Sequence, residues 1–132
     1  MENEDQSFET SFESAVAEAE NLCYVCRASE LQQEAAGRLQ ELEEQAKPLN
    51  AQAASTGDSN AANRMLCYEC RLRALRCELG MWVAIKDESM DEAWSALVRA
   101  QNATRCAMQA HERASHLDGY SARLLTLERL LF

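Results

Sequence analysis

The residues of this chain best suited to chemistry are cysteines arranged in pairs. Four of the six cysteines lie in a hexapeptide that is used twice, as LCYVCR at 22–27 and as LCYECR at 66–71. The likeness continues beyond the hexapeptide, since Leu31 corresponds to Leu75 and Glu34 corresponds to Glu78. The sequence thus contains two C-x-x-C motifs in similar local surroundings.

The paired thiols predict a metal site if the two motifs converge. On a helix, residues three apart share a face, so each motif can direct two thiolates toward one point. Together they would supply the four sulfurs of a tetrahedral zinc site, or would hold copper or an iron–sulfur cluster. The candidate metal ligands are Cys23, Cys26, Cys67 and Cys70.

A second interpretation of the same motif needs no cofactor, and the sequence favours it. Reduced cysteine is among the most frequently buried residues and packs as a small apolar side chain. Tyr24 with Arg27, and Tyr68 with Arg71, would then hold equivalent positions in two related helices, as expected for an internal duplication. A redox C-x-x-C of the thioredoxin type requires its first thiolate at a helix N-terminus, and neither motif is placed there.

The elements that must position these residues are all expected to be helices. One proline and four glycines in 132 residues leave few interruptions. Apolar residues follow helical spacing over 7–47, 61–86 and about 90–115, and a short leucine-rich helix follows Gly119. We therefore predict an all-α fold, an antiparallel four-helix bundle with two long helices, one medium helix and one short C-terminal helix.

The expected domain organisation is a single helical bundle covering residues 1–132. Residues 1–6 form an acidic lead-in, and 48–60 (PLNAQAASTGDSN) form the linker between the first two helices, because they open with proline and end in turn-forming residues. Ser59 or Asn60 is expected to cap the second helix.

The second predicted helix carries two apolar stripes instead of one. Cys67, Cys70 and Met81 belong to one stripe, and polar wedges separate it from the other. Because an ordinary surface helix has a single stripe, this helix must be covered from two directions, as a central element or as part of an interface. The candidate interface residues are the members of the other stripe and the C-terminal apolar residues: Met65, Tyr68, Leu72, Leu75, Leu79, Val83, Leu130, Leu131 and Phe132.

Charge and hydropathy narrow the classes of partner. The formal net charge of −9 disfavours sequence-independent binding to nucleic acid. No apolar run approaches the ~18 residues of a membrane span. The acidic N-terminal residues lack the features of a signal peptide, so the expected location is cytoplasmic, with the cysteines reduced.

Two short patterns resemble known helical families. Leu79-Gly80, Val83, Asp91-Glu92-Ala93 and Leu97 resemble one tetratricopeptide repeat, which implies helix-turn-helix packing between the second and third helices. The R-x5-H spacing of Arg105 and His111 resembles the HEPN ribonuclease-like domains, whose signature is an arginine followed a few residues later by histidine. That resemblance implies a helical nuclease or a nucleotide-binding domain, although Cys106 stands where the family usually has a polar residue.

The sequence therefore favours a non-enzymatic protein that acts by association, with a second copy of itself or with another helical protein. The evidence is the doubly striped second helix, the alanine-rich third helix and the apolar C-terminus. The alternative is a metal-binding bundle using the four paired cysteines, and the remote alternative is a HEPN-like enzyme.

Overall fold

The computed structural model describes residues 11–20, 29–111, 114 and 117–131. Residues 11–20 are helical, and four further helices follow: α2 (Ser29–Thr56), α3 (Ser59–Lys86), α4 (Met90–Ala110) and α5 (Leu117–Leu131). No strand occurs in this part of the chain, which confirms the all-α prediction. Within the described residues the helical segments number five, where the sequence predicted four helices.

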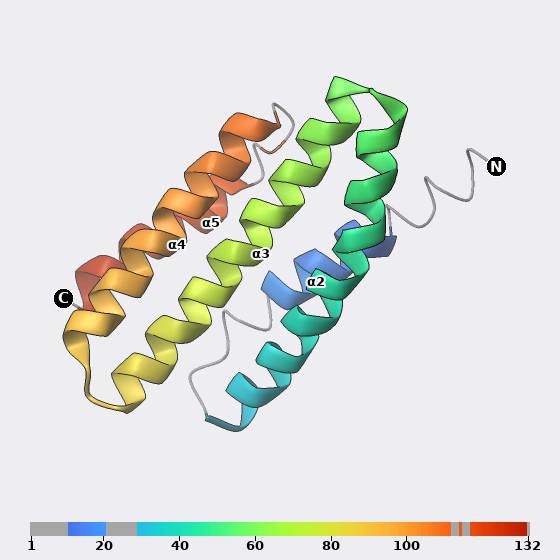
Figure 1. The fold of residues 1–132 in the computed structure, drawn as a ribbon. Coiled ribbons are helices and arrows are strands. Elements are labelled where there is room, and N and C mark those ends of the chain that lie inside the picture. Colours follow the sequence, from blue (N-terminus) through green and yellow to red (C-terminus); the bar gives the residue numbers. More distant parts are fainter. Residues whose placement is uncertain (1–10, 21–28, 112–113, 115–116, 132) are drawn as a thin grey trace.

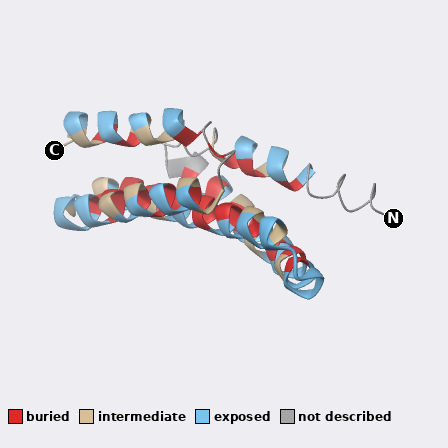
Figure 2. Cartoon of the chain, turned by 90° about the horizontal axis from the view of Figure 1, so that it is seen from above, coloured by how far each residue is buried: buried red, intermediate tan, exposed pale blue. Residues whose placement is uncertain are grey.

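The helices form two layers. α2, α3 and α4 lie side by side, with α3 in the middle and consecutive helices antiparallel (Figure 1). Seen from above, α5 and the helical residues 11–20 lie end to end across one face of these three (Figure 2). The buried sides of both covering helices face the three-helix layer (Figure 2). The core therefore lies between the layers as well as between neighbouring helices.

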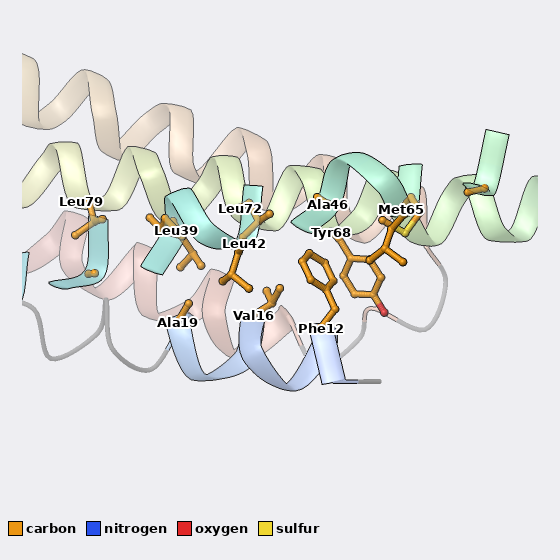
Figure 3. Close-up of a cluster of buried hydrophobic side chains, with 14 residues drawn as sticks. Phe12, Val16, Ala19, Leu39, Leu42, Ala46, Met65, Tyr68, Leu72 and Leu79 are labelled. Atoms are coloured by element: carbon orange, nitrogen blue, oxygen red, sulfur yellow. The ribbon is translucent and has the colours of Figure 1, made fainter. Parts of the chain in front are cut away.

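The expected first helix over residues 7–47 is not one straight helix. Val16 and Leu42 belong to the same buried cluster and lie close together (Figure 3). In one straight helix they would be ~39 Å apart, at ~1.5 Å per residue. Residues 11–20 are therefore a separate helical segment that packs against α2, and residues 21–28 are outside the described part. Apolar spacing did not reveal this because both segments have the same helical period. α2 does run without interruption through Gly37.

The predicted linker over 48–60 is wrong for most of its length. α2 continues through Pro48 to Thr56, and only Gly57 and Asp58 separate it from α3. Leu49 and Ala53 are buried in the core that α2 shares with α3, and this packing outweighs the cost of a proline in a helix.

The two residues between α2 and α3, Gly57 and Asp58, are of types suited to so short a connection. Gly57 has φ +69°, a conformation that only glycine adopts without steric cost. The Asp58 side chain accepts a hydrogen bond of 2.9 Å from the backbone N–H of Asn60 and caps α3. The cap is therefore Asp58, and neither Ser59 nor Asn60 as expected from sequence.

α3 is buried on three sides. The stripe that includes Tyr68, Leu72 and Leu75 packs with α2 and residues 11–20 (Figure 3). Met81 and Ala84 pack with the alanines of α4 and with Leu124 of α5. The small side chains Ala93, Ala96, Ala100, Ala103 and Ala107 form the buried face of α4, as the sequence predicted for close helix packing. α3 is thus the central element, and the α3–α4 hairpin agrees with the helix-turn-helix expectation.

Candidate functional site

A line of buried charge runs along α3, between its two apolar stripes. Arg71 and Glu78 lie seven residues apart on one face, and both are buried. The sequence indicated polar wedges on both sides of the stripes, but only the wedge with Glu69, Arg73 and Arg76 is exposed. The other wedge lies under the covering layer, so its charges require partners inside the protein.

Arg71 holds the first covering helix. Its guanidinium donates a hydrogen bond of 2.6 Å to the Glu20 carboxylate, and the Arg71 side chain is only 3% exposed. The same guanidinium lies 5.8 Å from the centre of the Tyr68 ring. The centres of the Tyr68 and Phe12 rings are 5.3 Å apart, and the two rings are nearly perpendicular. The Arg71 Nε atom is buried without a hydrogen-bond partner among the described residues. Glu20 and Phe12 therefore attach residues 11–20 to α3 at two points.

Glu78 holds the second covering helix, α5. The Tyr120 hydroxyl donates a hydrogen bond of 2.7 Å to the Glu78 carboxylate, and Arg123 donates to both carboxylate oxygens. Arg123 also lies 4.4 Å from the centre of the Tyr120 ring. The Glu78 side chain is completely buried. Burial raises the pKa of this carboxyl above its ordinary value, and the charge of Arg123 and the hydrogen bond from Tyr120 oppose that shift only in part.

Cys67 and Cys70 lie in a separate buried cluster between α3, α4 and the start of α5. Their neighbours are Ala107, Ala114 and Leu117. Burial raises the pKa of both thiols, so the neutral form, which packs as an apolar side chain, is favoured. Arg71 beside Cys67 and Arg73 beside Cys70 act in the opposite direction without reversing the shift.

The four-cysteine site stays a prediction. Cys67 and Cys70 are together, but Cys23 and Cys26 lie outside the described residues. Within the described ranges, no three histidine, cysteine or acidic side chains are arranged to hold a metal ion. The repeat also does not give equivalent positions in its later part, because Glu34 is exposed on α2 whereas its counterpart Glu78 is buried.

Most of the candidate interface residues are interior side chains of a single chain. Met65, Tyr68, Leu72, Leu75 and Leu79 are buried by α2 and residues 11–20, so they are not available to a partner. Val83 and Leu130 are exposed, Leu131 is half-buried, and Phe132 lies outside the described residues. The second stripe of α3 is therefore explained by packing within the chain.

The two residues of the HEPN-like pattern do not share a helix face. Arg105 is exposed on α4, whereas His111 follows the last residue of α4 as its C-cap, in extended conformation and half-buried. A hollow of about 440 Å³ lies elsewhere, between residues 11–20 and α2, with Glu18, Glu34 and Glu41 among its lining residues. A concentration of carboxylates alone does not define a catalytic site.

The sequence alone did not identify the partners of the buried charges. The signal was available on α3, since Arg71 and Glu78 fall between two apolar stripes that must both be covered. Their partners Glu20, Tyr120 and Arg123 come from helices whose placement depends on tertiary folding. These five residues define a structural site, two buried ion pairs that fasten two helices to a third.

The fold and this site define the class of protein: an all-α protein with a three-helix layer and two covering helices. None of the described helices combines the length and apolar character needed to cross a membrane. Comparisons with protein-family models, with curated proteins and with solved structures gave no match.

Proposed function

We propose that this protein acts by association, through the end of the molecule at which α3 passes into α4, and that the partner is a second copy of the chain. The observation that carries the proposal is a set of large apolar side chains exposed close to this end. Val83 lies in the last turn of α3, and Met90 and Trp94 lie in the first two turns of α4. The end of α5, which carries Leu130, reaches the same end of the molecule (Figures 1 and 2).

The degree of exposure supports a binding role for these residues. Val83, Met90 and Trp94 are each more than 40% exposed and Leu130 is 71% exposed, although the helices around them bury alanines completely. Tryptophan and methionine are enriched at protein interfaces because they supply large contact areas. An apolar surface is complementary to itself, so a two-fold contact between two copies requires no second kind of chain.

The test compares two positions on α3 that are matched in exposure. Val83 is 43% exposed near the α3–α4 turn, and Leu66 is 47% exposed near the opposite end of the helix. We expect the native chain to sediment as a dimer that dissociates on dilution. Val83→Ser combined with Trp94→Ser should shift the equilibrium to monomer by at least tenfold, about 1.4 kcal/mol, whereas Leu66→Ser should leave it unchanged. A native chain that is monomeric at every concentration contradicts the proposal.

A metal-binding bundle is the second candidate, and the placement of Cys67 and Cys70 in one buried cluster supports it. Zinc would have to displace the thiol protons, whose loss burial makes unfavourable. Elemental analysis of protein purified without chelators decides this alternative. A full equivalent of zinc, lost in the Cys67→Ser variant, supports it, and metal-free protein with six titratable thiols rejects it.

A further inference from the structure

The α3–α4 hairpin places Cys70 of α3 and Cys106 of α4 at the same level along two adjacent helices. The turn between the helices is short, and its backbone N–H groups of Asp87, Glu88 and Ser89 bond back to the end of α3. In an antiparallel pair joined by such a turn, residues equally distant from its centre lie at the same level. Cys70 lies eighteen residues before Glu88 and Cys106 lies eighteen residues after it.

Packing places Cys70 next to the turn of α4 that carries Cys106. Cys70 is in the same buried cluster as Ala107, the neighbour of Cys106 in sequence. The small side chains on the facing side of α4 allow the two helix axes to approach closely. Burial raises the pKa of Cys70, and the charge of Cys106 adds to that shift, as expected for thiols on adjacent helices. The two thiols differ in access, since Cys106 is exposed and Cys70 is only 3% exposed.

We propose that Cys106 and Cys70 form a reversible disulfide that joins α3 to α4, with Cys106 as the thiol that reacts first and Cys70 as the resolving thiol. The co-reactant is a small-molecule disulfide such as oxidised glutathione. The Cys106 thiolate attacks one glutathione sulfur, its S–S bond breaks, and one glutathione thiolate leaves and takes up a proton. Cys70 then loses its proton and attacks the Cys106 sulfur, which releases the second glutathione. Two protein thiols are oxidised and one glutathione disulfide is reduced to two glutathiones.

The order of the two steps follows from burial. A dissolved disulfide can reach Cys106, which is exposed, but not Cys70, which is buried. Once Cys106 carries glutathione, the Cys70 thiol attacks a sulfur of its own chain, so the second step is intramolecular. The reaction is a property of the α3–α4 hairpin, independent of the proposed self-association.

The experiment treats the full chain with oxidised glutathione and maps the product by tryptic digestion without reduction. Cleavage after arginine releases Cys67 and Cys70 in the peptide 65–71, and Cys106 in the peptide 106–113. The expected product is these two peptides joined, in a chain that has lost two hydrogen atoms, and reductant should reverse it. The oxidised protein should also unfold at a higher temperature than the reduced protein, because the bond restricts the unfolded chain.

Single cysteine substitutions distinguish the Cys70–Cys106 disulfide from other possible disulfides. Cys106→Ser, at an exposed position, should abolish the link and leave the peptide 65–71 free of glutathione. Cys70→Ala should stop the reaction at the mixed disulfide on Cys106, whereas Cys67→Ser and the control Cys77→Ser should retain the link. A bond between Cys67 and Cys70, a bond from either thiol to another cysteine, a link between two chains through Cys106, or glutathione remaining on Cys106 of the native chain would each overturn the proposal.

Discussion

Glu78 is an ionisable residue in an environment that disfavours charge, because its side chain is completely buried. A carboxyl with no exposed surface is retained only because Arg123 and Tyr120 supply three hydrogen bonds to it. Such an arrangement adds little net stability compared with an apolar core of the same size, but breaking it is costly. Its contribution is to the placement of α5, since the observed position brings Tyr120 and Arg123 to the carboxyl.

Removing the cation of this pair is expected to destabilise the protein strongly. Arg123→Met should lower the free energy of unfolding by about 3–5 kcal/mol at neutral pH, because it leaves a buried carboxyl without its partner. Denaturant titration measures the loss. The control is Arg38→Met, which removes the exposed Arg38–Glu41 pair and should cost at most about 1 kcal/mol. Equal costs for the two variants would show that Glu78 and Arg123 are not a buried pair in solution.

Glu78 should also give the stability of the protein a characteristic pH dependence. Because burial raises the pKa of this carboxyl in the folded state above its value in the unfolded chain, the folded state binds the proton more tightly. The resulting stabilisation is fully present below the unfolded-state pKa and is lost as pH rises through the folded-state pKa.

Glu78→Gln isolates this effect from that of the other carboxyls. The variant should show a smaller decrease in stability than the native chain over the pH range between the ordinary glutamate pKa and neutrality. Unfolding free energies measured across this range for both proteins provide the comparison. Parallel curves would mean that Glu78 titrates normally.

At the scale of elements, α2 shows how packing overrides local preference. Pro48 cannot donate a backbone hydrogen bond, and its ring crowds the carbonyl of residue 44, yet the helix continues for eight residues beyond it. The apolar residues on both sides of Pro48, including Ala46 and Leu49, are buried against α3. The burial of this apolar face of α2 offsets the cost of the missing hydrogen bond and the crowding at Pro48.

Pro48→Ala is therefore expected to stabilise the protein. The gain should be about 1–3 kcal/mol, since alanine removes the helix penalty but also makes the unfolded chain more flexible. Thermal or denaturant unfolding measures it, with Gln52→Ala, at an exposed position one turn later, as a control expected to change stability by less than about 0.5 kcal/mol. Destabilisation by Pro48→Ala would imply that α2 does not continue through this position.

At the scale of the whole molecule, self-association must overcome charge repulsion. The net charge is −9, and the proposed contact end carries Asp87, Glu88, Asp91 and Glu92. Because salt screens repulsion between exposed charges without weakening apolar contacts, the dimer should become tighter as sodium chloride is raised. Sedimentation at low and high salt tests this expectation. A dimer that dissociates with added salt would indicate a contact made by ion pairs.

Helix content was predictable from the sequence, whereas helix placement was predictable only in part. Composition and apolar spacing were sufficient for the all-α class and for the expectation that α3 is covered from two directions, because these depend on local pattern. They did not decide between a central helix and an interface. The packing of residues 11–20 against α2 and the passage of α2 through Pro48 depend on contacts between distant residues, such as Val16 with Leu42. The same limit applies to the site: Arg71 and Glu78 stand out on α3, but nothing local identifies Glu20 or Arg123 as their partners.

The separate fastening of the two covering helices has a consequence for how the molecule opens. Arg71 holds residues 11–20 and Glu78 holds α5, and these two residues lie seven positions apart on α3. We therefore expect each covering helix to lift from the layer beneath while the other stays in place. Amide exchange with deuterated solvent should then give these two segments their own opening free energies, and a variant that loosens one should leave the protection of the other intact.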